Sequence, residues 1–275
     1  MALNGYDISN YQKNMSISKV ASDFVIIKAT QGTTYYSPSF EKQITEAFAN
    51  NRLVGVYHYV SSSNYKSEVD FFISKIKPYI GKVLICVDWE GKDNPMFGNV
   101  NYITGFMDYL YSVTKVKPII YMSKSVARSS YWTTVPNNYE LWCAQYKNND
   151  KLYQYNPNPW TDTKGFGKFK NPIIYQYSSK GHLPGYNSDL DLDIAYMTRD
   201  EWINRCRVES SAVINDNASV PRTALVTAET LNIRTGSSSS TKDLGDLKRG
   251  SVITIDKVEN GFAHFEGWCS LKYLQ

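Results

Sequence analysis

The chain has 275 residues, of which 42% are hydrophobic, and its 30 basic and 26 acidic residues give a formal net charge of +4. This length and composition suit one large globular core with a small second domain, and they exclude disordered, collagen-like and transmembrane classes. Because the charges of both signs are interspersed, we expect no nucleic-acid partner. The first residues lack the basic-then-apolar order of a secretory signal, so we expect a cytosolic chain with no membrane span.

The first three quarters of the chain alternate β-branched runs with segments of helical period, a pattern typical of βα units around a parallel sheet. Helices are predicted around residues 40–48, 69–76 and 102–113, where apolar residues share one face. After Tyr146 the helical period disappears, so the last strands are expected to be joined by loops. The predicted strands are residues 5–9, 24–29, 54–59, 83–89, 118–122, 141–146, 172–177 and 191–195.

Eight such strands predict an α/β fold, an irregular TIM-like (β/α) barrel with helices missing in its last part. An open doubly wound sheet stays open as the alternative, because no pattern in the sequence shows closure. The predicted barrel domain covers residues 1–206. Residues 207–222 have neither period nor large aromatic side chains and are predicted to be a linker.

The segment 223–275 differs from the rest of the chain, because it contains short alternating runs typical of a small all-β barrel. Asn260 and Gly261 stand between two of these runs, and this pair favours a type I′ hairpin. No acid and base constellation is present in the segment, so we interpret it as a binding module.

Two carboxylates stand at the end of the fourth predicted strand, in the order Asp88, Trp89, Glu90. Residues two apart on a strand point to the same side and lie about 6.6 Å apart along it. Like charges at this spacing raise one pKa, which leaves one acid protonated beside an ionised neighbour. Glycoside hydrolysis uses such a pair. An isolated acidic pair at a strand end also occurs in ordinary solvated loops.

The first and last predicted strands carry further acids, Asp7 and Asp191. In a closed ring these strands are neighbours, so four acids are expected to share one rim, where barrels of this class hold their catalytic groups. Asp193 lies on the same strand face as Asp191, and spacing alone does not separate the two.

Other chemistry has weaker support. The three histidines show no zinc-protease spacing, and neither a GxGxxG motif nor a phosphate loop is present, so no metal and no cofactor are predicted. His58 is either a pocket residue or a core residue. Cys143 is interpreted as a buried strand residue rather than a nucleophile.

The order of five blocks resembles glycoside hydrolase family 25, the lysozymes that cleave bacterial cell walls. Each block is weak alone, but together they span about residues 3–199. The blocks are Gly5-Tyr6-Asp7-Ile8-Ser9 with Tyr11-Gln12, Phe24-Val25-Ile26-Ile27-Lys28-Ala29-Thr30, Gly55-Val56-Tyr57-His58-Tyr59, Asp88-Trp89-Glu90, and Tyr175-Gln176-Tyr177-Ser178-Ser179 through Gly185 to Asp191-Leu192.

This resemblance implies cleavage of the β-1,4 bond between N-acetylmuramic acid and N-acetylglucosamine in peptidoglycan. It assigns Glu90 as general acid and Asp88 as the group that orients the substrate's 2-acetamido nucleophile, with retention of configuration. Asp7 and Asp191 complete the ring of acids, and Asp191 is selected over Asp193 by its place before Leu192. The chain departs from the family pattern at Gln31, where Glu is frequent, and at Asp193, where Asn is usual.

The segment after residue 223 resembles a bacterial SH3-like domain through residues 231–236, 248–250, 267–268 and 272–274. The resemblance implies binding to peptidoglycan of a Gram-positive wall, with a folding or dimerising appendage as the alternative. We expect the two-domain protein to be a bacteriophage endolysin, made in the host cytoplasm and released to the wall through a holin.

Aromatic residues near the proposed rim are candidates for stacking on sugars, with ordinary barrel packing as the alternative. Two further hypotheses are kept, a non-catalytic wall-binding pseudoenzyme and a chitinase-like hydrolase, although the chitinase signature is missing around Asp88. The predicted substrate-binding residues are Tyr59, Trp89, Tyr121, Trp142 and Tyr146.

Overall fold

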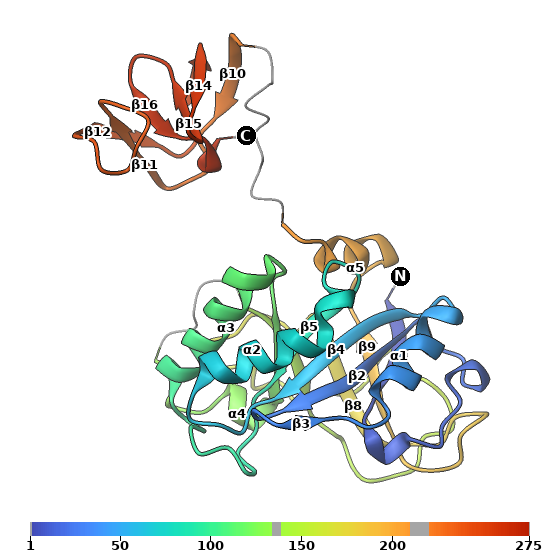
Figure 1. Cartoon of the computed structure of the whole chain (residues 1–275). Helices are drawn as coiled ribbons and strands as arrows, with labels where there is room; N and C mark the ends of the chain where they lie inside the picture. Colours follow the sequence, from blue (N-terminus) through green and yellow to red (C-terminus); the bar gives the residue numbers. More distant parts are fainter. Residues whose placement is uncertain (1, 134–138, 210–219, 275) are drawn as a thin grey trace. The chain divides into compact units, whose positions relative to one another are not determined.

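The computed structural model describes residues 2–133, 139–209 and 220–274. The chain divides into two compact units, Met1–Val208 and Glu209–Gln275 (Figure 1). Most of the predicted linker, residues 210–219, lies outside the described residues.

A closed ring of eight strands forms the first unit. The first strand pairs with both the second and the last, and this double pairing closes the sheet and excludes the open doubly wound alternative. The predicted irregular (β/α) barrel is thereby confirmed. The ring consists of β1 (Leu3–Ile8), β2 (Phe24–Gln31), β4 (Leu53–Tyr59), β5 (Leu84–Asp88), β6 (Ile119–Ser123), β7 (Glu140–Ala144), β8 (Ile174–Gly181) and β9 (Leu190–Ala195), and the short β3 (Tyr35–Tyr36) pairs with β2 outside it.

The direction of β9 differs from the expected parallel sheet. This strand runs antiparallel to both β8 and β1, whereas the other neighbours in the ring are parallel. As a consequence, the beginning of β9 lies at the rim where the parallel strands end. Asp191, the second residue of β9, therefore reaches the same rim as the ends of β1 and β5.

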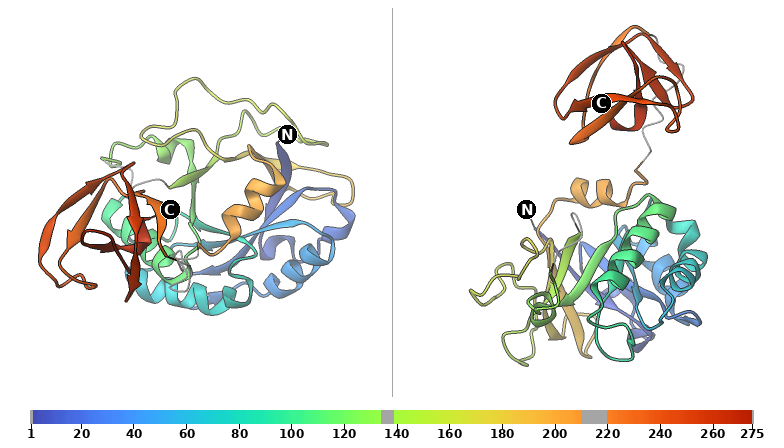
Figure 2. Two further views of the ribbon diagram at one scale, coloured as in Figure 1. Left: turned by 90° about the horizontal axis from the view of Figure 1, so that it is seen from above. Right: turned by 90° about the vertical axis from the view of Figure 1, so that its left-hand side faces the viewer.

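Full-length helices cover only part of the described barrel, as Figure 2 shows. The predicted helices are present as α1 (Phe40–Ala49), α2 (Tyr65–Ile76) and α3 (Val100–Thr114), and their apolar faces pack on the outer side of the strands. After β6 there is a single turn, α4 (Lys124–Ala127), and the described connections β7–β8 and β8–β9 contain no helix. The remaining helical segments are the 3-10 turns η1 (Asn10–Gln12), η2 (Ile17–Lys19) and η3 (Lys77–Tyr79) and the last helix α5 (Arg199–Cys206).

The apolar core has two layers, one outside the ring of strands and one inside it. Helix α5 closes the interior at the end opposite the rim, since Trp202 and Cys206 are buried in the inner layer and Trp202 contacts the ring of Phe24 at a centroid distance of 4.8 Å. The Phe24 ring also requires a glycine at position 5, because a Cβ atom on Gly5 would lie 2.6 Å from that ring. No helix in the described parts of the chain is long and apolar enough to span a membrane.

The second unit consists of short antiparallel strands around a small core of its own. Asn260 and Gly261 both adopt positive φ, 52° and 74°, between the paired strands β14 and β15, as the predicted hairpin requires. The strands are β10 (Arg222–Leu225), β11 (Thr230–Arg234), β12 (Asp243–Lys248), β13 (Val252–Ile255), β14 (Lys257–Glu259), β15 (Phe262–His264) and β16 (Trp268–Ser270), followed by the 3-10 turn η4 (Leu271–Tyr273).

Candidate active site

Polar side chains of the strands gather at one end of the barrel. Side chains alternate between the two faces of a strand, so a polar residue two positions after a buried interior residue also faces the interior. Asp88 follows the interior residue Cys86 in this way, and Gln176 follows Ile174. The residues that line the resulting cavity of about 330 Å³ are Asp7, Ser9, Tyr11, Gln12, Lys28, Tyr57, Tyr59, Asp88, Glu90, Tyr121, Trp142, Tyr146, Gln176 and Asp191.

Asp88 and Glu90 face this cavity together with Lys28 of β2. Asp88 is buried and Glu90 is half-buried. Burial raises the pKa of both carboxyls; the charge of Glu90 raises that of Asp88 further, and Lys28 lowers both. The Lys28 ammonium donates to Gln31 Oε1 at 2.7 Å and lies 4.7 Å from the ring centre of Tyr59. Burial therefore makes both carboxyls of the cavity harder to ionise, and the Lys28 ammonium acts in the opposite direction.

Asp7 lines the same cavity and is held by the side-chain amide of Gln176. Gln176 Nε2 donates to Asp7 Oδ2 at 2.5 Å, while Gln176 Oε1 accepts from the hydroxyls of Tyr146 at 2.6 Å and Tyr121 at 2.9 Å. Burial, followed by the charge of Asp193, raises the pKa of Asp7 well above its usual range.

Asp191 lines the same cavity, directly opposite Asp7 in the register of β1 and β9. Burial raises the pKa of Asp191 to about 8, and the charges of Asp7 and Glu90 act in the same direction. All four acids proposed from the sequence are thus brought to one cavity. Asp193 does not line it, because its side chain lies one layer deeper in the barrel.

The model of glycosyl hydrolases family 25 matches residues 6–186, about two thirds of the chain. The chain belongs to glycosyl hydrolase family 25. It is an enzyme of this lysozyme family, and the cavity with its carboxylates is the candidate active site. The matched segment includes Asp7, Asp88 and Glu90 and ends before Asp191.

Several known proteins are similar to this family 25 chain. An N,O-diacetylmuramidase of Chalaropsis sp is 29% identical over 152 residues, 49% of this chain and 70% of the relative. Lysozyme M1 of Streptomyces globisporus is 26% identical over 208 residues, 68% of this chain and 65% of the relative. Among solved structures, the catalytic domain of endolysin ply40 from Listeria monocytogenes bacteriophage P40 has a TM-score of 0.59 at 22% identity, covering 76% of this chain and 98% of that domain.

The aromatic residues predicted to bind sugar divide into two groups. Tyr59, Tyr121, Trp142 and Tyr146 line the cavity of this family 25 enzyme. Trp89 does not, and this prediction is wrong. Its side chain is fully buried in the outer layer, and the period of two turns it away from the face that carries its two acidic neighbours.

His58 is a core residue rather than a pocket residue. Its ring is fully buried, with Nδ1 at 2.7 Å from Thr30 Oγ1 and Nε2 at 3.1 Å from Glu68 Oε1. The rings of Phe72 and Phe106 lie at centroid distances of 5.1 and 5.5 Å from the imidazole ring.

Sequence reasoning left Lys28, Gln176 and Tyr11 of the cavity without a role. Lys28 and Gln176 each stand two residues after a buried apolar residue of the barrel interior. Because side chains alternate along a strand, their inward orientation can be predicted once the barrel is assumed. Tyr11 follows Ser9, whose side chain caps η1, and its own side chain is 93% exposed beside the cavity. A lone exposed tyrosine in a loop gives no comparable signal.

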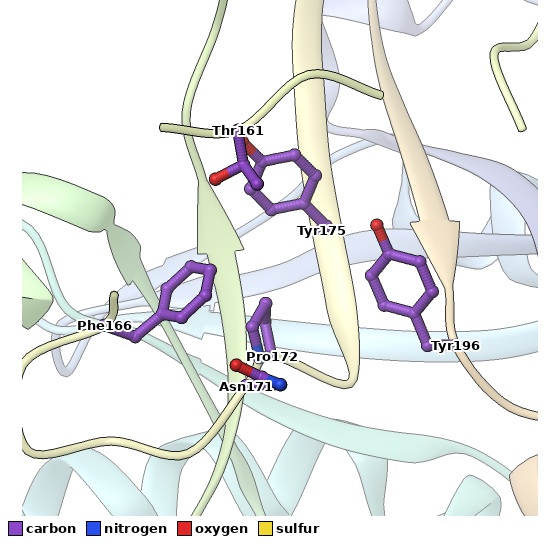
Figure 3. A pocket seen from close by; sticks show the side chains of 6 residues that line it. All are labelled: Thr161, Phe166, Asn171, Pro172, Tyr175 and Tyr196. Carbon is purple, nitrogen blue, oxygen red and sulfur yellow. The ribbon is translucent and has the colours of Figure 1, made fainter. Parts of the chain in front are cut away.

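A second cavity of about 390 Å³ lies beside β8 and β9 on the outer side of the barrel (Figure 3). Its aromatic walls include Tyr175, which belongs to the outer core layer and donates to the carbonyl of Trp160 at 3.0 Å. None of its lining residues is an acid, so it lacks the groups that glycoside hydrolysis needs. The lining residues are Thr161, Phe166, Asn171, Pro172, Tyr175 and Tyr196.

Proposed function

We propose that this enzyme is an N-acetylmuramidase that hydrolyses the β-1,4 bond between N-acetylmuramic acid and N-acetylglucosamine in peptidoglycan. The observation that carries the proposal is the placement of Asp88 and Glu90 in one cavity, two residues apart at the end of β5. The family relationship and the similarity to a muramidase and a lysozyme support the same substrate class.

Glu90 is the general acid in this mechanism. Partial burial raises its pKa, which keeps a proton on the carboxyl at a higher pH than in water. That proton passes to the glycosidic oxygen as the bond from this oxygen to the anomeric carbon breaks. The resulting carboxylate then accepts a proton from the water that completes hydrolysis.

Asp88 orients the internal nucleophile of the substrate. Its Oδ1 atom is buried and accepts no hydrogen bond from the described part of the chain. The N–H of a substrate 2-acetamido group supplies the missing donor, and this contact turns the acetamido oxygen toward the anomeric carbon. Attack by that oxygen gives a cyclic oxazolinium ion, which water opens with overall retention of configuration.

Mass spectrometry of digested peptidoglycan tests the activity. A muramidase produces fragments with a new reducing N-acetylmuramic acid end, whereas reducing N-acetylglucosamine ends or free peptides contradict the proposal. Parallel digestion of chitin oligomers separates it from a chitinase-like hydrolase. The Glu90→Gln variant is the matched control, and a wild-type chain that binds walls without any cleavage would support the pseudoenzyme hypothesis instead.

The mechanism has a separate test in Asp88→Asn, which keeps the size of the side chain but removes its charge. We expect kcat to fall by roughly 10²- to 10⁴-fold, because the oxazolinium ion loses the carboxylate that stabilises it. Proton NMR of the first product from wild-type enzyme must show the β-anomer. An initial α-anomer rules out the substrate-assisted route.

The second unit is proposed to be an SH3-like domain that binds a Gram-positive wall. It is supported by the separate antiparallel core of this unit and by two aromatic side chains. Tyr273 is exposed, and the Lys257 ammonium lies 5.5 Å from the indole centre of Trp268. Joining a wall binder to a hydrolase raises the local concentration of cleavable strands. Sedimentation of residues 209–275 with purified Gram-positive walls tests this role.

The biological role is proposed to be that of a phage endolysin, which accumulates in the host cytoplasm and reaches the wall through a holin. The combination of a family 25 catalytic unit with a separate small β unit supports it. Expression in a Gram-positive host with and without a pore-forming holin tests it, since lysis in both cultures contradicts holin-dependent release.

A further inference from the structure

The second cavity, beside β8 and β9, is not used in the proposed mechanism. Its volume of about 390 Å³ is comparable to the 330 Å³ of the active-site cavity. β9 runs away from the rim, because Ala195 at its end pairs with Leu3 at the start of β1. Tyr196 follows Ala195 and lies about 16 Å along an extended strand from Asp191. A ligand in the second cavity is therefore separate from one held between the acids at the rim.

Aromatic rings form two flanks of this cavity. Figure 3 shows Phe166 and Tyr196 on opposite sides of it, with Pro172 between them. Tyr196 is 50% exposed, so its ring keeps an open surface, and its backbone N–H donates to the carbonyl of Ile173 at 2.8 Å. An open aromatic face held by a fixed backbone is suited to packing against the C–H face of a sugar ring.

A buried ion pair holds the flank of the cavity that carries Thr161 and Phe166. Lys124 of α4 is buried, and its Nζ atom lies 2.8 Å from Asp162 Oδ1 and donates to Thr161 Oγ1 at 2.8 Å. The same ammonium lies 4.4 Å from the ring centre of Phe166. A buried ammonium is costly unless it is paired and hydrogen-bonded, so this contact set resists rearrangement. The flank is therefore preformed.

Gln145 connects this ion pair to the floor of the cavity. Its Nε2 donates to Asp162 Oδ2 at 2.7 Å, and its Oε1 accepts from Thr161 Oγ1 at 3.0 Å. The hydroxyl of Tyr175 donates to the carbonyl of Trp160 at 3.0 Å. Because the polar atoms of Thr161 and Tyr175 are occupied in this way, these two residues offer a ligand mainly their carbon surfaces.

Two neutral polar groups of the cavity remain available to a ligand, the side-chain amide of Asn171 and the hydroxyl of Tyr196. Within residues 2–133, 139–209 and 220–274, neither group makes a hydrogen bond to another residue. The six lining residues are uncharged, and the Lys124 charge behind them is paired with Asp162. A charged ligand would lose its hydration there without gaining a partner, so the cavity favours a neutral one. Aromatic walls with a few neutral polar groups are typical of small-molecule sites.

We propose that this cavity is a second saccharide site, which binds an N-acetylhexosamine ring of the wall glycan away from the bond that is cut. One face of the sugar packs on Tyr196, and its hydroxyl and acetamido groups bond to the free polar groups of Asn171 and Tyr196. Peptides with free carboxylates and amines fit the uncharged lining less well. The inference rests on the proposed function, because it takes the substrate of that function as the ligand.

The test is an NMR titration of the full-length Glu90→Gln variant with N-acetylglucosamine. The signals followed are the side-chain amide of Asn171 and the backbone amide of Tyr196. We expect both to move with added sugar and to stay in place when the charged tripeptide alanyl-glutamyl-lysine is added instead. In a second variant that also carries Tyr196→Ala, the affinity measured at Asn171 should fall by roughly 2- to 10-fold. Tyr153→Ala is the matched control and must keep the affinity, since this exposed tyrosine does not line the cavity.

Two results of the titration overturn the proposal. The first is the absence of any movement at Asn171 and Tyr196 up to the solubility limit of the sugar, which decides even if the Tyr196→Ala chain fails to fold. The second is a larger movement with the tripeptide than with the sugar, which would make the cavity a peptide site.

Activity provides the second readout, measured on chains that keep Glu90. Tyr196→Ala should lower the rate on intact walls by roughly 2- to 10-fold and leave kcat/KM on soluble disaccharide fragments unchanged, because only a wall offers a second sugar while the first is being cut. An equal loss on both substrates overturns the proposal. Products without muramic ends would instead overturn the proposed function, since the titration measures sugar binding without any cleavage.

Discussion

Gln176 and Asp7, which are 169 positions apart in the chain, are joined by a hydrogen bond of 2.5 Å from the amide Nε2 to the carboxylate Oδ2. The amide cannot rotate without loss, because its oxygen accepts from the hydroxyls of Tyr121 and Tyr146. Those two phenols thus determine which end of Gln176 faces the acid. The orientation of Asp7 in β1 therefore depends on Gln176 of β8, on Tyr121 of β6 and on Tyr146, which follows β7.

We expect Gln176→Glu to lower kcat/KM by roughly 10- to 100-fold, since it replaces the donor by an acceptor and sets a new carboxyl against Asp7. Tyr146→Phe is the graded control, because Tyr121 still donates to Gln176 and a smaller loss is expected. Steady-state kinetics on soluble peptidoglycan fragments measures both. If the two variants have equal activities, the amide does not orient Asp7.

The protonation of Glu90 predicts the alkaline side of the pH profile. Its pKa is raised by burial and lowered again by Lys28, and the general acid is active only while protonated. Activity should therefore fall as pH rises through the raised pKa. Lys28→Met removes the opposing charge, so the alkaline limb of kcat/KM should move to higher pH. A shift to lower pH would mean that Lys28 does not stabilise the Glu90 carboxylate.

The acids of the cavity also predict how stability depends on pH. Burial raises the pKa of Asp191 from 3.8 to about 8, so the folded state favours its protonated form. Its contribution to stability is complete below about pH 4 and is lost as pH rises toward 8. We expect the thermal midpoint of the wild type to fall between pH 5 and pH 9 and that of Asp191→Asn to fall less. Scanning calorimetry of both proteins at pH 5 and pH 9 measures these midpoints. Equal decreases in the wild type and in Asp191→Asn contradict the prediction.

Tyr11 is expected to contribute to substrate binding rather than to chemistry. Its side chain is exposed and lines the cavity, and no hydrogen bond joins its hydroxyl to an acid among the described residues. Tyr11→Ala should raise KM by roughly 2- to 10-fold, the effect of one stacking contact, with kcat nearly constant. Tyr153→Ala, another exposed tyrosine that does not line the cavity, is the control. A lower kcat with unchanged KM would show that Tyr11 acts in the chemical step.

The strands of the barrel and the pairing of Asp88 with Glu90 could be predicted from the sequence, because apolar runs and a spacing of two are local signals. Closure of the ring had no such signal, and the choice of Asp191 over Asp193 depended on the family resemblance rather than on spacing. The direction of β9 could not be predicted, since alternating residues read the same in either direction. That direction decides that Asp191, at the start of its strand, reaches the rim. The error at Trp89 was avoidable, because the period of two that pairs Asp88 with Glu90 turns the residue between them outward. The contact of Gln176 with Asp7 depends on closure of the ring and has no local signal.

A chain ending at Val208 is expected to fold and to cleave soluble fragments while sedimenting poorly with whole walls. The division between the two units falls there, and the catalytic unit keeps α5, whose Trp202 and Cys206 fill the lower end of the barrel. A chain ending at Thr198 is the matched comparison, since loss of α5 exposes the ring of Phe24 and should prevent folding. Circular dichroism, fragment hydrolysis and wall sedimentation are measured for both. If the chain ending at Val208 sediments as well as the full-length enzyme, the second unit is not the wall binder.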